Sequence, residues 1–90
     1  MTKERYYADC KLAINLMLDG DWDGSHKIVQ EINHNVAQWI HAVLHKIEGD
    51  ASNSKYWYAR CSLANYDDFE IPNEELLHIC LLYTSDAADE

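Results

Sequence analysis

Two histidines four residues apart are the first feature of this sequence that could do chemistry. His41 and His45 lie in the apolar-rich stretch 36–48, and helical spacing places both imidazoles on one face. Pairs of histidines with this spacing bind zinc, and Glu48 lies three residues further along the same strip. Ala42, however, occupies the position where the zinc-protease motif requires glutamate, so that motif is absent.

A metal site would need a third ligand, and two further histidines could supply it. His26 or His34 would reach the pair only if the helices that carry them pack beside it. The structural alternative is that His41 is hydrogen-bonded in a helix interface while His45 is partly exposed. A metal site formed by His26, His41, His45 and Glu48 is therefore an alternative, and no cofactor is assigned.

Tyr56, Trp57, Tyr58 and Arg60 form the densest aromatic cluster of the chain. Consecutive residues of a helix point about 100° apart, so three neighbouring rings cannot all face the core. We expect Trp57 to face inward and at least one tyrosine to lie at a surface, where its amphipathic ring suits binding. Stacking of Arg60 on Tyr56, four residues earlier, is expected as well. The alternative is that both tyrosines pack at the edge of the core.

The other candidate groups indicate little chemistry. Asn53 either caps the preceding turn or holds a peptide backbone. Cys10 and Cys61 lie on apolar stripes, which suits inert thiols, although a pairing of Cys61 with a histidine remains an alternative. With Cys80 the chain has three cysteines, an odd number, and no two of them form a CxxC pair. Neither a disulfide framework nor a zinc knuckle is therefore expected. Phosphate-binding loops and nucleophile elbows are absent, and no catalytic residue is assigned.

Composition and charge narrow the class of protein. The chain has 90 residues, of which 48% are apolar, enough for one small domain with a core. A formal charge of −9 argues against a nucleic-acid partner, and half of the 16 acids follow residue 65. No apolar run spans a membrane and no signal peptide is recognisable, so we expect a cytoplasmic protein with no membrane partner.

Apolar periodicity predicts helices over residues 3–18, 22–32, 36–48 and about 51–64. Asp21 and Asn35 are the expected N-caps of the second and third helices, and Gly20 and Gly49 end the first and third. Residues 65–72 read as an acidic loop, and a further capped helix begins at Asn73. No stretch alternates as a strand would, so the chain is expected to be all-α.

Residues 80–90 resemble one reading frame of a transposon-based sequencing adapter over all eleven positions. The alternative is a natural acidic tail. The resemblance implies a non-native tail, a native gene that continues beyond Ile79, and a metagenomic source.

The helices form an internal repeat, since Gly20-Asp21 and Gly49-Asp50 occupy matching places 29 residues apart. Each turn follows one apolar helix and precedes another, and such hairpins bury their faces by stacking. This pattern resembles the tetratricopeptide repeat over residues 5–65, although the spacing is shorter than in that family and the final proline is missing. The positions that match its consensus are Ala13 and Ala42, Ser25 and Ser54, Val29 and Tyr58, and Ile32 and Cys61.

A second resemblance covers residues 37–50, Asn53 and residues 56–58, which are similar to small bacterial proteins of uncharacterised families. It implies no activity.

These observations predict two stacked antiparallel helical hairpins with a truncated fifth helix. The expected divisions are a tetratricopeptide-like domain over 1–65, an acidic loop and truncated helix over 66–79, and the tail over 80–90. The expected function is a non-enzymatic interaction module that binds a protein or peptide, or itself as a homodimer. The alternative is a small metal-binding or enzymatic domain. The expected contact residues are His41, His45, Asn53, Tyr56, Tyr58 and Arg60.

Overall fold

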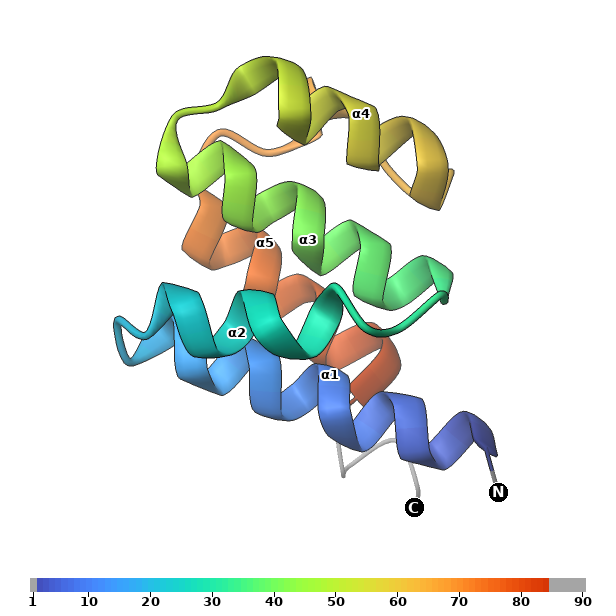
Figure 1. Cartoon of the computed structure of the whole chain (residues 1–90). Coiled ribbons are helices and arrows are strands. Elements are labelled where there is room, and N and C mark those ends of the chain that lie inside the picture. Colours follow the sequence, from blue (N-terminus) through green and yellow to red (C-terminus); the bar gives the residue numbers. More distant parts are fainter. Residues whose placement is uncertain (1, 85–90) are drawn as a thin grey trace.

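The computed structural model describes the backbone of residues 2–84 and the side chains of residues 6–83. Residues 85–90 of the expected tail lie outside this range. Every regular secondary-structure element of the described chain is a helix, which confirms the all-α prediction (Figure 1). The elements are α1 (Thr2–Leu18), α2 (Trp22–Val29), α3 (Asn35–Glu48), α4 (Ala51–Cys61), the 3-10 turn η1 (Tyr66–Asp68), α5 (Pro72–Ile79) and the π-helical turn η2 (Cys80–Thr84).

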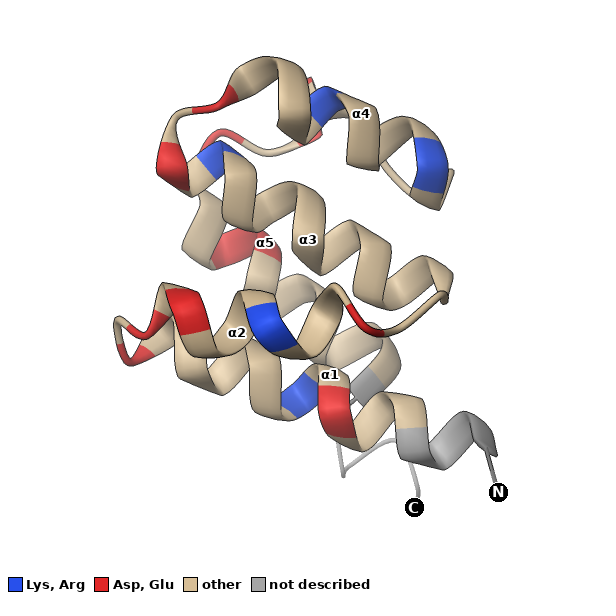
Figure 2. Ribbon diagram, in the orientation of Figure 1, with Lys and Arg blue, Asp and Glu red and all other residues tan. Residues whose placement is uncertain are grey.

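The two Gly-Asp turns have the same local construction. Gly20 and Gly49 have φ values of +93° and +92°, the left-handed conformation that glycine adopts without steric cost. Asp21 then accepts a hydrogen bond from the backbone N–H of Gly24, and Asp50 accepts one from Asn53. Each aspartate therefore starts the next helix by satisfying one of its free N–H groups. Figure 2 shows the acidic residues of both turns at the same end of the molecule.

Some helix ends differ from the sequence prediction. α2 ends at Val29 rather than Ile32, and α4 ends at Cys61 rather than Ala64, where Ser62 turns left-handed with φ +60°. The N-cap of α3 is His34, whose Nδ1 accepts from the backbone N–H of Val36 at 3.2 Å. The predicted cap, Asn35, instead donates its side-chain amide to the carbonyl oxygen of Cys61 at 2.8 Å. Asn35 thus ties the start of α3 to the end of α4.

α3 is the central element. α1 pairs with α2 and α3 pairs with α4, while α3 also contacts α1, α2 and α5 (Figure 1). Every side chain from Val36 to His45 is buried, as expected of a helix with neighbours on all sides. The buried apolar core consists of Cys10, Ala13, Ile14, Val29, Val36, Ala37, Trp39, Ile40, Ala42, Val43, Leu44, Tyr58, Cys61, Leu76 and Ile79.

α5 belongs to the same core. Leu76 and Ile79 are fully buried, and the helix packs against α3 and α1. Helical structure continues past Ile79 through η2, where Leu81 is 69% exposed. The segment 66–79 therefore supplies packing side chains to the helices of segment 1–65.

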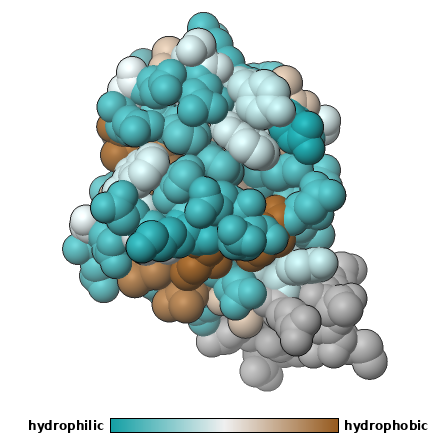
Figure 3. Space-filling model, viewed as in Figure 1, coloured by the Kyte–Doolittle hydropathy of each residue, from teal (hydrophilic) through white to brown (hydrophobic). Residues whose placement is uncertain are grey.

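The surface is mostly hydrophilic in the view of Figure 3, with apolar side chains gathered along the edge formed by α1. Among the described residues, no helix is both long and apolar enough to cross a lipid bilayer.

Candidate metal centre

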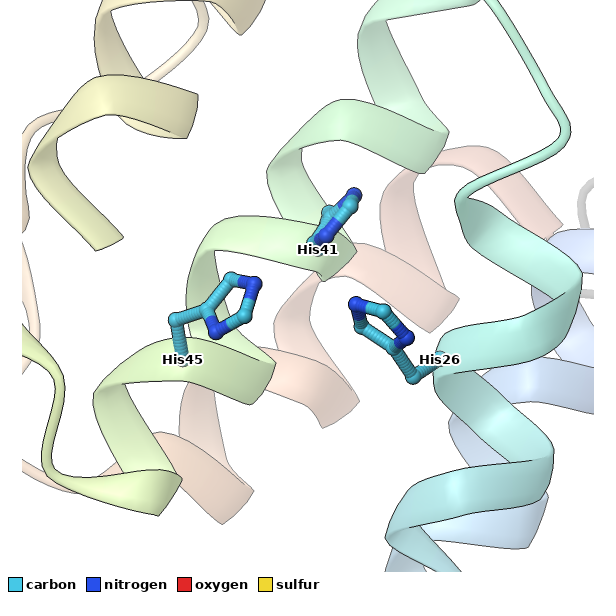
Figure 4. Close-up of side chains that lie close together, drawn as sticks. All are labelled: His26, His41 and His45. Atoms are coloured by element: carbon cyan, nitrogen blue, oxygen red, sulfur yellow. The ribbon is translucent and has the colours of Figure 1, made fainter. Parts of the chain in front are cut away.

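Three histidines from two helices converge between α2 and α3. His26 comes from α2, and His41 and His45 come from α3 (Figure 4). One ring nitrogen of each residue lies within 4.8 Å of those of the other two. The ring centroids are 4.7 Å apart for His26 and His41, 5.4 Å for His26 and His45, and 4.9 Å for His41 and His45. The four-residue spacing on α3 therefore produces the predicted pair, and packing of α2 adds His26 as the third member.

Trp22 fixes α2 against α3 at this point. Its indole Nε1–H donates to the carbonyl oxygen of Leu44 at 2.7 Å, a bond between two helices. The same indole stacks on His26, with ring centroids 4.7 Å apart and planes 10° from parallel. The tryptophan at the start of α2 thus positions both its own helix and the histidine one turn later.

His41 is the most deeply buried of the three, at 4% exposure. The Trp57 ring of α4 stacks on it with centroids 4.0 Å apart and planes 14° from parallel. Its Nδ1 is buried and has no hydrogen-bond partner in the described part of the chain. Burial, with smaller contributions from His26 and His45, lowers the pKa of His41 to about 3. His41 is therefore a neutral imidazole at physiological pH, which is the form that binds metals.

His45 is held by Glu48, one turn later on α3. Its Nδ1 lies 2.7 Å from Oε1 of the carboxylate. Because a carboxylate accepts hydrogen bonds, this contact places a proton on Nδ1 and leaves Nε2 as the ligand nitrogen. Glu48 thus contacts the nitrogen of His45 that faces away from the other two histidines and is not one of the three converging groups. Carboxylates in this position orient metal-binding histidines.

His26 is the partly exposed member of the cluster. Burial and the neighbouring His45 lower its pKa, against the opposing effect of Glu48 and Asp23. Its side chain provides the accessible side of the site. His34 lies elsewhere, because it caps α3 and contacts the rings of Tyr6 and Tyr7.

The remaining expected contact residues are divided between surface and interior. Tyr56 is 53% exposed, and the Arg60 guanidinium lies 5.9 Å from its ring centroid, as the spacing predicts. Tyr58 is buried at 3% exposure, so its ring is not available on the surface. Its hydroxyl donates to Glu75 at 2.7 Å, and burial and this bond raise its pKa. Asn53 is half-buried, and its backbone N–H donates to Asp50 at 3.2 Å.

Sequence reasoning missed a second buried polar cluster, centred on Glu75. This carboxylate is fully buried, and its Oε2 accepts from Trp39 Nε1 and from the Tyr58 hydroxyl, each at 2.7 Å. Its Oε1 accepts from Lys46 Nζ at 2.9 Å. Lys46 also donates to the carbonyl oxygen of Phe69 at 3.2 Å. The cluster connects α3, α4 and α5, and only the position of Glu75 on the inner face of α5 signals it in the sequence.

Cys10 and Cys61 are unsuited to nucleophilic chemistry. Burial raises the pKa of Cys10 to about 12, and it also raises that of Cys61. The Cys61 thiol donates to the carbonyl oxygen of Tyr58 at 3.3 Å. Both therefore remain protonated packing side chains.

No protein-family model matches the chain, and no curated protein or solved structure is significantly similar to it. The tetratricopeptide resemblance therefore stays a prediction. A functional assignment must come from the geometry of the site, because a helical fold hosts many functions.

Proposed function

We propose that this protein binds one divalent transition-metal ion, of the zinc class, through His26, His41 and His45. The observation that carries the proposal is the convergence of three imidazole nitrogens within 4.8 Å of one another. Tetrahedral zinc with Zn–N bonds of about 2.0–2.1 Å requires nitrogens roughly 3.4 Å apart. The three nitrogens would therefore have to move closer together on binding, and His26 is the only one of the three side chains that is not fully buried.

The surroundings of the three rings support a cation. Burial favours the neutral form of His41, Glu48 orients His45, and Nδ1 of His41 has no competing partner in the described part of the chain. Five carboxylates of the two Gly-Asp turns attract cations to this end of the molecule (Figure 2). They are Asp19, Asp21, Asp23, Glu48 and Asp50.

The ligand set also indicates the type of metal chemistry. Three neutral imidazoles suit zinc, copper, nickel or cobalt and leave the charge of the ion uncompensated. Three protein ligands leave a fourth position for water or another ligand, as in catalytic zinc sites. The proposal concerns metal binding, and it assigns no reaction.

Calorimetric titration of the full chain, prepared without a polyhistidine tag, tests the proposal directly. We expect one zinc ion per chain and a loss of affinity of at least about 100-fold in His26→Asn, because two ligands replace three. His26 is the appropriate site for substitution because its side chain is partly exposed. The matched control is His78→Asn, since His78 is exposed on α5 and lies outside the cluster.

Two results would reject a metal centre. One is the absence of saturable zinc binding by a chain whose circular dichroism shows it to be helical. The other is equal affinity of the wild type and His26→Asn, which would place the metal elsewhere. A rise in the midpoint of thermal unfolding with zinc provides a second readout, because a ligand that binds only the folded chain stabilises it.

An interaction module remains a second candidate, favoured by the outer face of α4. Tyr56 is 53% exposed and Arg60 lies over its ring, and Leu63, two residues after the helix ends, is 39% exposed. An exposed aromatic ring beside an arginine suits a protein contact. Sedimentation of the wild type and of Tyr56→Ser tests the homodimer form, and a monomer at all concentrations would reject it.

A further inference from the structure

A small cavity lies where the chain passes from the first helix pair to the second. Its volume is about 220 Å³, and it is lined by the end of α2, by residues 30–33, and by side chains of α3 and α4. None of the three histidines of the candidate metal centre belongs to its lining. Spaces between packed helices are common binding places for small molecules, so the cavity is a separate candidate site.

Two opposite charges line this cavity. Arg60 belongs to α4 and Glu31 to the connection between α2 and α3, and both side chains are exposed to solvent. Neither forms a salt bridge with the other or with any further residue that the structure describes. The guanidinium lies 5.6 Å from the ring centroid of Trp57, which also lines the cavity. A cation and an anion that share a cavity without pairing complement a ligand that carries both charges.

Two side-chain amides add a hydrogen-bond donor and an acceptor. Gln38 is 8% exposed, and its Nε2 donates to Oδ1 of Asn33 at 3.1 Å. This bond leaves the carbonyl oxygen of Gln38 as an acceptor and the Nδ2 of Asn33 as a donor. The cavity therefore offers one neutral donor in addition to Arg60 and one neutral acceptor in addition to Glu31.

The remaining walls are apolar. Val29 is 1% exposed, and Ile32 and Trp57 are partly buried. The volume corresponds to roughly seven water molecules, which limits a ligand to about as many non-hydrogen atoms. A ligand of this size carries one short apolar group besides its charged groups.

We infer that the cavity binds a free α-amino acid with a short apolar side chain. Its carboxylate accepts from Arg60 and Asn33, its ammonium donates to Glu31 and Gln38, and its side chain lies against the apolar wall. Arginine suits the carboxylate because it forms two parallel hydrogen bonds with it. A simple carboxylic acid would leave Glu31 beside a like charge, and a simple amine would do the same to Arg60. The inference does not depend on the metal centre.

The test is a titration of the metal-free, ¹⁵N-labelled full chain with L-valine, followed by NMR. Isovalerate, which lacks the ammonium group, and isobutylamine, which lacks the carboxylate, are the matched control ligands. We expect valine to shift the signals of the Trp57 indole and of the Gln38 and Asn33 amides. The indole of Trp39, which is bonded to Glu75, should stay unchanged. Each control ligand should bind at least about fivefold more weakly, because exposed charge contacts are individually weak.

Two substitutions assign the charges. Arg60→Gln should lower the affinity for valine to about that for isobutylamine, and Glu31→Gln should lower it to about that for isovalerate. Lys55→Gln and Glu70→Gln are the matched controls, since both residues are exposed and lie outside the cavity, and they should keep the wild-type affinity. Because Arg60 and Glu31 are exposed, their substitution leaves the core intact, which circular dichroism verifies.

Three results would overturn the inference. They are the absence of shifts at the cavity signals, equal affinity for valine and either control ligand, and unchanged affinity in Arg60→Gln or Glu31→Gln. Since the chain carries no metal in this titration, such a failure leaves the zinc proposal standing, and a failure of zinc to bind leaves the amino-acid site standing.

Discussion

Replacement of Glu75 by leucine would remove the acceptor shared by three donors in the core. Trp39 Nε1, the Tyr58 hydroxyl and Lys46 Nζ all donate to this carboxylate, at 2.7, 2.7 and 2.9 Å. Leucine has a similar volume, so the change leaves little cavity. The main consequence is that the ammonium of Lys46, whose side chain is 8% exposed, loses its counter-charge.

The expected cost follows from these contacts. Removing one partner of a buried ion pair destabilises a protein by about 3–5 kcal/mol, because the remaining charge stays desolvated. The carbonyl oxygen of Phe69 still accepts from Lys46, and the rings of Tyr58 and Tyr66 lie 4.9 and 5.1 Å from its nitrogen, which moderates the loss. We therefore expect about 3 kcal/mol, against a total of roughly 5–15 kcal/mol for a domain.

Urea unfolding followed by circular dichroism measures this loss. With a slope of about 1 kcal/mol per molar urea for a chain this small, the midpoint should fall by about 3 M. Glu74→Gln is the matched control, because Glu74 also occupies the first turn of α5 but is exposed. It should cost less than about 0.5 kcal/mol. A loss below about 1 kcal/mol in Glu75→Leu would refute the burial of this carboxylate and the docking of α5 that depends on it.

Three further predictions follow from the site and the turns. Glu48→Gln should weaken zinc binding about 10–100-fold in calorimetry by releasing His45, while Asp50→Asn, an exposed carboxylate nearby, should change it little. The metal-free protein should lose stability as the pH falls below about 6.5, because the unfolded chain protonates a histidine that the fold keeps neutral. Because the pKa of His41 is about 3 in the folded chain, its contribution lowers the free energy of unfolding by about 2 kcal/mol at pH 5. Urea unfolding of His41→Gln should not show this contribution. Gly49→Ala, at φ +92° with open space around a new Cβ, should cost about 1–2 kcal/mol of backbone strain in the same assay.

The helices were predictable because their signals are local. Apolar spacing and the Gly-Asp turns place α1 to α4 within a few residues of their observed bounds. The errors lie at the helix ends, and a tertiary contact explains the one at the start of α3. Asn35 bonds the carbonyl oxygen of Cys61, so His34 caps α3 instead, and α2 ends at Val29 although Ile32 continues its apolar pattern.

The candidate site was predictable only in part, because it depends on how the helices pack against one another. The spacing of His41 and His45 fixes their common face within one helix, but the approach of His26 depends on how α2 packs on α3. Glu48 lies on the predicted strip, yet only the geometry shows that it bonds Nδ1 of His45. Glu75 is the clearest omission, since an acid in an acidic segment is normally solvated, and its partner Lys46 is 29 residues away.

Both polar clusters originate on α3, and the helix separates them. Trp39 and Lys46 are seven residues apart and share one face, which meets Glu75. His41 and His45 point about 200–240° around the axis from Trp39, toward α2 and α4.

The two clusters share no hydrogen bond, so their energetic effects should be additive. Glu75→Leu should therefore lower stability without changing the zinc affinity of the folded protein, whereas His26→Asn should weaken zinc binding and leave the α5 contact intact. Zinc, in turn, would link α2 to α3 and so join the two helix pairs, and the stabilisation it gives should be equal in the wild type and Glu75→Leu.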